Sequence, residues 1–205
     1  EIEYLHNFLK NLEFERFYFD RPFYYSANSI NKLFRKVGMT LYDIEEIDVH
    51  GGSIRCYIKN SQECFKTNRC KKILSDEINY LIINNFKKFN SQIYKDSKYF
   101  KNQLEKLKKE KKVIIGYGSP ARVSTITNLS KINMSLINYI IDDSPLKQNR
   151  FTPGMHIKIL PRKNNINRKI SIVIVFAYEY FEDIKKYFKN QKVEFFKPIP
   201  FERLR

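Results

Sequence analysis

The sequence predicts an α/β fold with a mostly parallel sheet in its carboxy-terminal part, preceded by a helix and a β-hairpin. From Val113 onward, short apolar runs alternate with amphipathic segments, a pattern typical of a parallel sheet covered on both faces. Residues 74–111 contain neither Gly nor Pro and keep apolar residues at helical spacing. The chain therefore divides into an amino-terminal part, a helical segment and a strand-helix domain.

The amino-terminal part contains an amphipathic helix over residues 29–38. Its apolar residues fall at i, i+3, i+4 and i+7, with Asn28 and Ser29 as candidate caps and Gly38 as a stop. Two apolar-rich segments, 41–49 and 53–58, follow it and are joined by a glycine-containing turn. The simplest interpretation is a β-hairpin.

The carboxy-terminal part is expected to start with a strand that ends at a glycine pair. The further elements expected in it are a helix over 121–129, strands over 137–141 and 172–176, a helix containing Phe181, Ile184 and Phe188, and a last strand over 193–196. These apolar strands suit the interior of an α/β sheet.

Bulk composition excludes several classes of protein. No apolar run reaches the roughly 18 residues of a membrane span, and no basic segment followed by an apolar one marks a secretory signal. We therefore expect a cytoplasmic protein without a membrane partner, and the absence of an initiator Met suggests a piece of a longer chain.

Cysteine content and charge bear on whether the protein binds a metal or nucleic acid. The three cysteines form no C-x-x-C pair, which predicts reduced thiols and no metal site. The net charge of +16 attracts polyanions in general, but the lysines are spread along the chain. A solvated helix face explains the densest run, 106–112, better than a nucleic-acid patch, so a nucleic-acid partner is unlikely.

The stretch Gly-Tyr-Gly-Ser-Pro-Ala at 116–121 matches G-x-G-x-x-A between a strand and a helix. Asp142 and Asp143 end the next strand, at about the distance where a dinucleotide fold holds a ribose. However, Pro120 has no amide to donate to a phosphate. The pattern alone leaves two interpretations open: a dinucleotide site, or a Rossmann-like packing turn that binds another ligand or none.

Two longer blocks are more specific. The first runs from Phe14 to Ser26 and continues, after the amphipathic helix, in Val-His-Gly-Gly-Ser-Ile-Arg at 49–55. The second joins Gly-Tyr-Gly-Ser-Pro-Ala-Arg at 116–122 to IDDSPLKQNRFTPGMHI at 141–157. Together they resemble the S-adenosylmethionine-dependent C-methyltransferases that act on nucleotide-linked deoxysugars.

The resemblance implies a fold and a domain division. It predicts the last helix and β-hairpin of a class I methyltransferase domain in residues 1–60, a helical connector over 61–111, and a Rossmann-like carboxy-terminal domain over 112–205. It also implies S-adenosylmethionine as cofactor. The family's donor-binding glycine loop and its zinc-binding cysteines are not in this sequence, so we expect association with a missing amino-terminal domain.

The resemblance also implies catalytic positions. Where the family has Tyr-His-Glu-His, this chain has Tyr18, Phe19, Asp20 and Arg21. C-methylation beside a ketone needs a base and a group that stabilises an enolate. Phe19 cannot exchange a proton and Arg21 stays protonated, so Asp20 or His50 is the candidate base, while Tyr18 and Arg21 are candidates for the enolate.

Substrate contacts are expected mainly from basic and loop residues. A nucleotide-sugar is anionic, and basic groups near a helix amino terminus suit it. The candidates are Arg55, Gly116, Gly118, Ser119, Arg122, Asp142, Lys147 and Arg150. The leading interpretation is the carboxy-terminal part of a sugar C-methyltransferase. The alternative is a catalytically altered or inactive nucleotide-sugar-binding module.

Overall fold

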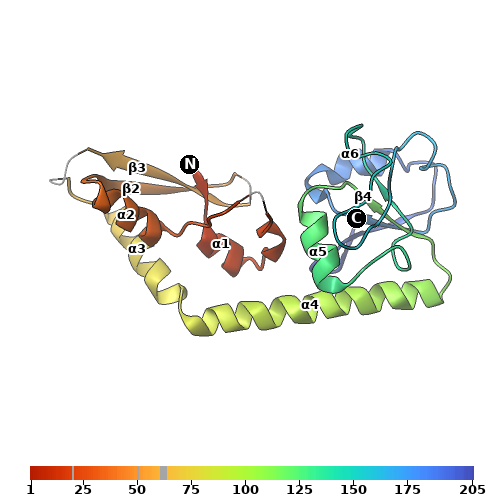
Figure 1. Cartoon of the computed structure of the whole chain (residues 1–205), viewed down its shortest axis with the longest axis horizontal. Coiled ribbons are helices and arrows are strands. Elements are labelled where there is room, and N and C mark those ends of the chain that lie inside the picture. Colours follow the sequence, from red (N-terminus) through yellow and green to blue (C-terminus); the bar gives the residue numbers. More distant parts are fainter. Residues whose placement is uncertain (20, 50, 61–63) are drawn as a thin grey trace. The chain divides into compact units, whose positions relative to one another are not determined.

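The computed structural model describes residues 1–19, 21–49, 51–60 and 64–205, which form two compact units (Figure 1). The first unit is Glu1–Gln92 and the second is Ile93–Arg205. The long helix α4, Ile83–Lys109, runs across the boundary between them. The sequence had predicted three parts with boundaries at residues 60 and 111, and these domain boundaries stay a prediction.

The first unit is built around a three-stranded antiparallel sheet in the order β1-β3-β2. The elements of this unit before α4 are β1 (Ile2–Glu3), α1 (Leu5–Lys10), the 3-10 helix η1 (Phe14–Arg16), α2 (Ala27–Lys36), β2 (Thr40–Ile47), β3 (Ser53–Lys59) and α3 (Asn68–Tyr80). The pairing of Ile47 with Ser53 and of Thr40 with Lys59 confirms the expected hairpin. The sequence patterns had not indicated β1 and α1.

Helices α2 and α3 lie on the same face of this sheet (Figure 1). Their buried residues Ile30, Cys70 and Leu74 pack with Leu41 and Ile44 of β2 in one core. Burial of these side chains is the main stabilising term for such a small sheet. Helix α3, which falls inside the expected connector, is therefore part of the core of the first unit.

The start of α2 differs from the expectation. The cap is Ser26, whose hydroxyl accepts the amide of Ser29 at 3.1 Å, while the Ser29 hydroxyl accepts the amide of Ser26 at 2.9 Å. This reciprocal arrangement satisfies two amides at the helix start, which a cap at Asn28 or Ser29 would not do. The helix therefore begins two residues earlier than predicted.

The second unit confirms the α/β class. Its sheet has the order β6-β5-β4-β7-β8-β9, and all neighbouring pairs are parallel except β8 and β9. Its elements after α4 are β4 (Ile114–Tyr117), α5 (Arg122–Ser130), β5 (Ile140–Ile141), β6 (Ile159–Leu160), β7 (Ile172–Val175), the 3-10 helix η2 (Tyr178–Tyr180), α6 (Phe181–Lys186), β8 (Glu194–Lys197) and β9 (Glu202–Leu204). In chain order this is the 3-2-1-4-5-6 arrangement of a Rossmann-like fold.

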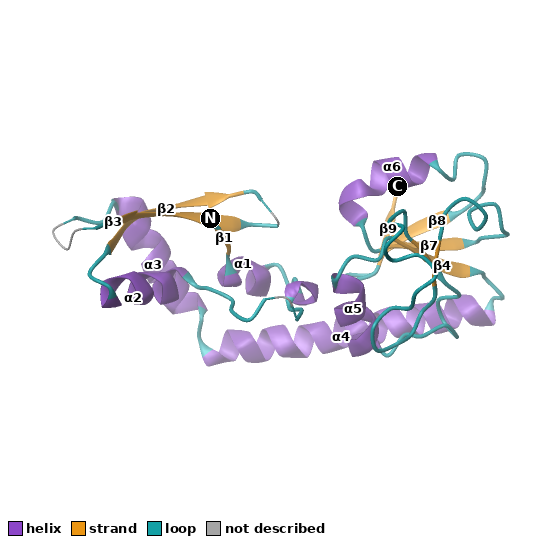
Figure 2. Ribbon diagram, turned by 45° about the horizontal axis from the view of Figure 1, so that its top comes forward, coloured by secondary structure: helices purple, strands orange, loops and turns teal. Residues whose placement is uncertain are grey.

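Helices cover both faces of the sheet, with α6 on one side and α5 on the other (Figure 2). On the α6 side, Ile115, Val173 and Val175 pack with Ile184 and Phe188. Every residue of β4 and β7 is buried, as the apolar runs predicted. Within the described ranges, no helix combines the length and apolarity that a membrane crossing requires.

Two details of this sheet correct the sequence analysis. The segment 193–196 is not the last strand, because β9 follows it and pairs antiparallel with β8. The strand expected over 137–141 is reduced to Ile140–Ile141, since Leu136 and Ile137 belong to a turn before it. An apolar run shows burial, but it does not distinguish a buried turn from a buried strand.

Candidate functional site

The glycine turn follows β4 at the point where the sheet order reverses, between β4 and β7. Gly118 has φ +80°, and its amide donates to the carbonyl of Ile141 at 2.8 Å. A Cβ at this position would lie 2.5 Å from the Cβ of Ala177, which follows β7. Only glycine fits here, both for its left-handed backbone and for this close approach.

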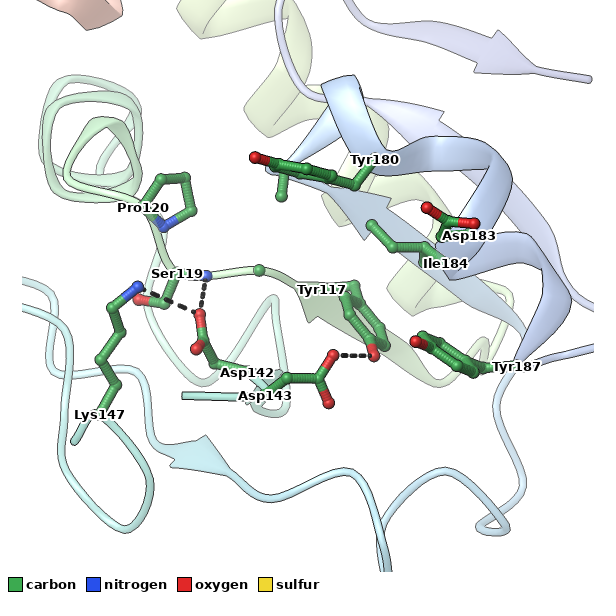
Figure 3. A pocket seen from close by; sticks show the side chains of 12 residues that line it. Tyr117, Ser119, Pro120, Asp142, Asp143, Lys147, Tyr180, Asp183, Ile184 and Tyr187 are labelled. Atoms are coloured by element: carbon green, nitrogen blue, oxygen red, sulfur yellow. Dashed lines mark hydrogen bonds and ion pairs between the residues drawn. The ribbon is translucent and has the colours of Figure 1, made fainter. Parts of the chain in front are cut away.

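A pocket of about 390 Å³ opens at the carboxyl ends of β4, β5 and β7. Open α/β sheets hold their ligands at this position. It is lined by Tyr117, Gly118, Ser119, Pro120, Asp142, Asp143, Lys147, Ala177, Tyr180, Asp183, Ile184 and Tyr187 (Figure 3). Its volume is within the range of small-molecule sites.

The side chain of Asp142 lines the pocket and is hydrogen-bonded to the glycine turn (Figure 3). Its side chain accepts the amide of Ser119 at 2.6 Å and the amide of Ser144 at 2.9 Å, and Lys147 Nζ lies 3.5 Å away. The residue is only 7% exposed. The amide of Ser119, which a dinucleotide loop would direct at a phosphate, is therefore already engaged by a protein carboxylate.

The other loop amides are engaged or missing as well. The amide of Gly118 bonds to Ile141, and Pro120 has none to donate. Three successive positions that would face a pyrophosphate in a dinucleotide fold thus offer it no free donor. The geometry favours the packing-turn interpretation of this glycine motif over a nicotinamide dinucleotide site.

A second network surrounds Asp143. Its carboxylate accepts the Tyr117 hydroxyl at 2.9 Å and lies 3.3 Å from Arg162 Nε. The Arg162 guanidinium stands 3.6 Å from the ring centroid of Tyr187, which stacks on Tyr117. Burial, together with this hydrogen bond to Asp143, raises the pKa of Tyr117, so its hydroxyl is a neutral donor at ordinary pH.

The pocket brings together four of the predicted substrate residues: Gly118, Ser119, Asp142 and Lys147. The other three predicted substrate residues of this unit, Gly116, Arg122 and Arg150, do not line the pocket. Gly116 is enclosed in β4, where a Cβ would lie 2.8 Å from Ile140 Cγ1. Arg122 pairs with Glu179 at 2.5 Å and lies over the Tyr178 ring. Arg150 is exposed beyond the lining.

The sequence did not predict that residues of η2 and α6 form one wall of the pocket. Tyr180, Asp183, Ile184 and Tyr187 complete the pocket from this side. The helical spacing of Ile184 with Phe181 and Phe188 was visible in the sequence, but it indicated core packing only. Nothing in the sequence joined α6 to the glycine turn.

The first unit carries the predicted catalytic positions. Arg21 forms an ion pair with Glu3, and its guanidinium lies 5.2 Å from the ring centroid of Tyr18. The Tyr24 hydroxyl accepts the amide of Tyr18 at 3.0 Å and holds this loop in place. Asp20 and His50 lie outside the described residues.

Arg55 is on β3, away from that loop in the sequence. Its guanidinium pairs with Glu1 at 2.6 Å and with Glu45 of the neighbouring strand at 3.3 Å. These contacts are cross-strand pairs of the kind that stabilise a sheet surface. In the part of the chain that the structure describes, no three His, Cys, Asp or Glu side chains gather as metal ligands.

Fold and pocket together define an α/β domain of Rossmann-like order with a pocket at its switch point. Residues 48–200 match the family described as the C-methyltransferase C-terminal domain, and this chain belongs to that family. The chain is also similar to the C-methyltransferase NovU of Streptomyces niveus, with 24% identity over 210 residues. That match covers 100% of this chain and 50% of NovU, so the chain spans about half the length of this curated relative.

Proposed function

We propose that this chain is the carboxy-terminal part of a C-methyltransferase that acts on a nucleotide-linked deoxysugar. The observation that carries the proposal is the pocket at the switch point of a domain whose family is shown. The resemblance of the two sequence blocks supports the substrate class, and the similarity to NovU supports the reaction class.

The lining of the pocket supports an uncharged ring of the substrate as its occupant. Three tyrosines and Pro120 supply flat apolar surfaces, and three carboxylates with Lys147 supply polar groups. Rings that carry hydroxyl or N–H groups suit such a lining, because aromatic faces pack against the ring and carboxylates accept its donors. A diphosphate would meet Asp142, Asp143 and Asp183 against only one lysine, and we place it outside the pocket.

In the proposed reaction, a base removes a proton from the carbon beside the sugar ketone. Asp20 or His50 is the candidate base, and Tyr18 can donate a hydrogen bond to the developing enolate oxygen. Arg21 would add a positive charge to the same oxygen. Its ion pair with Glu3 reduces that charge, so we assign Arg21 a positioning role over the Tyr18 ring.

The glycine turn, which is where a Rossmann-like domain would hold a cofactor, does not fit S-adenosylmethionine, the family's methyl donor. The strand-glycine-helix turn of the second unit has its amides engaged, as shown for Ser119 and Gly118. We therefore propose that a domain not included in this chain holds the donor.

Calorimetry on this chain tests the substrate site. We expect a dTDP-linked deoxysugar to bind and S-adenosylmethionine and NAD to give no heat of binding. A matched pair of variants reports on location: Tyr187→Ala removes a pocket wall, while Tyr94→Ala removes an exposed tyrosine of α4. Tight NAD binding, or equal loss of sugar-nucleotide binding in both variants, contradicts the proposal.

The alternative, a binding module without turnover, is favoured by Phe19, which is 91% exposed where the family has a proton-transferring group, and by the Arg21–Glu3 pair. Deprotonation needs no methyl donor. The chain and a nucleotide-linked ketosugar in D₂O should therefore exchange the proton beside the ketone if the base is present. Exchange that disappears in Asp20→Asn supports catalysis; binding without exchange supports the module.

A further inference from the structure

The opposite end of the second unit's sheet carries a separate basic groove. It lies at the amino ends of β7 and β8 and has a volume of about 500 Å³. Two loops line it, and neither contributes to the pocket at the carboxyl ends. The lining residues are Asn167, Arg168, Lys169, Ile170, Asn190, Gln191 and Lys192.

The two loops are braced against each other and against the core. Gln191 Nε2 donates to the carbonyl of Ile166 at 2.6 Å, which ties the loop before β8 to the loop before β7. The hydroxyl of buried Tyr139 donates to the carbonyl of Asn165 at 3.1 Å, and the Arg168 guanidinium lies 5.6 Å from its ring centroid. The groove is thus held in shape before any ligand arrives.

Its charge is of one sign. Arg168, Lys169 and Lys192 are exposed cations, and no carboxylate stands among the lining residues. The nearest acid in the sequence, Glu194, pairs with Arg203 at 3.4 Å. Among the described residues, the three groove cations take part in no ion pair given by the structure. Their positive potential is therefore not cancelled locally.

We propose that this groove is a second binding site, which takes the phosphoryl groups of a small polyphosphate. Three cations flanked by the side-chain amides of Asn167 and Asn190 match an anion with several oxygen acceptors. The volume of the groove is within the range of small-molecule sites. Single-stranded nucleic acid fits less well, because no aromatic ring lines the groove for a base to stack on.

The site is independent of the proposed function. β7, Ile172–Val175, has four residues and separates the groove from the pocket by roughly 13 Å along the strand. A ligand in the groove therefore does not touch a ligand in the pocket. Binding of a polyphosphate and of a sugar nucleotide should be simultaneous rather than competitive.

The test is titration of the chain with tripolyphosphate and with ATP, followed by backbone amide NMR at 0.15 M salt. At this ionic strength the screening length is about 8 Å, so that scattered surface lysines contribute little. We expect both anions to shift the amides of residues 167–170 and 190–192. A response to both anions supports recognition of the phosphates. A response to ATP alone would overturn the proposal, because the nucleoside would then be the group that binds.

A matched pair of triple variants distinguishes binding in the groove from attraction to the overall positive charge of the chain. Arg168→Gln, Lys169→Gln and Lys192→Gln together remove the groove cations. Lys95→Gln, Lys98→Gln and Lys106→Gln remove the same charge from exposed positions of α4. The groove variant should weaken binding at least about tenfold and the control less than about threefold.

Three further results would overturn the proposal: equal weakening in the two triple variants, no saturable binding at 0.15 M salt, or competition between tripolyphosphate and a pocket ligand. Failure of sugar-nucleotide binding in the pocket would leave this site untouched, because the anion titration does not use the pocket.

Discussion

The carboxylate of Asp142, at the end of β5, accepts the backbone amide of Ser119 at a distance of 2.6 Å. This bond joins the glycine turn after β4 to the loop that begins at Ser144, whose amide the same carboxylate accepts. A family motif that looked like a ligand contact is therefore a clamp between two loops of the pocket.

Asp142→Asn should destabilise the chain by about 1.5–3 kcal/mol, because hydrogen bonds from amides to a buried carboxylate are stronger than those to a neutral amide. The measurement is urea unfolding followed by circular dichroism. Asp143→Asn is the control: its side chain is 48% exposed and Asn can still accept the Tyr117 hydroxyl. It should cost less than about 1 kcal/mol. Equal losses of unfolding free energy in the two variants would contradict the role of Asp142 as a clamp between the loops.

Gly118→Ala should cost about 2–4 kcal/mol, which combines a left-handed backbone with overpacking against Ala177. Thermal and urea unfolding measure the loss. In the background Ala177→Gly, the same substitution should cost clearly less, since the opposing Cβ is gone. An undiminished cost there would show that the backbone conformation alone requires glycine.

The sequence predicted the glycine turn, the acidic strand end and the alternation of buried strands with helices after Val113, because these features follow from local composition and periodicity. It could not predict the direction of the Asp142 side chain. Whether a carboxylate at a strand end faces a ligand or a neighbouring loop depends on the packing of Ser119 and Ser144 around it. That packing is tertiary and leaves no local signal.

Tertiary packing also explains why the pocket residues after β7 were not predicted. Tyr180 and Tyr187 reach the pocket because β7 lies beside β4, although more than fifty residues separate them from the glycine turn. β6 and β9 were missed because they have two and three residues, too few for any period to show. The resemblance to a family is what supports the substrate class that we propose, since local patterns indicate none.

Glu77→Gln should destabilise the first unit by about 2–3 kcal/mol, since charged hydrogen bonds of this kind are among the stronger ones. Glu77 is buried in α3, and its carboxylate accepts the amides of Ala27 at 2.5 Å and Asn28 at 2.7 Å. The negative charge also lies at the amino terminus of α2, where the helix dipole favours it. Asp76→Asn, an exposed neighbour in the same helix, is the control and should change little. Similar urea midpoints for both variants would contradict this role.

Stability should fall as the pH drops below about 6.5, with His6 as one cause. Its ring packs against Tyr80, with centroids 4.5 Å apart, and against Tyr4 at 5.3 Å. Burial, helped by the nearby charge of Lys10, lowers the pKa of His6, while Glu46, Glu77 and Asp76 oppose this shift. Below its ordinary pKa, the unfolded chain binds a proton that the native state does not bind, so acid favours unfolding.

The slope of unfolding free energy between pH 7 and 5, measured in urea, should become flatter in His6→Gln than in the unmodified chain. Lys10→Gln removes the cation that opposes protonation, and it should raise the pKa of His6, as read from its ring signals by NMR. A slope that stays the same in His6→Gln would show that another group carries the acid sensitivity of this unit.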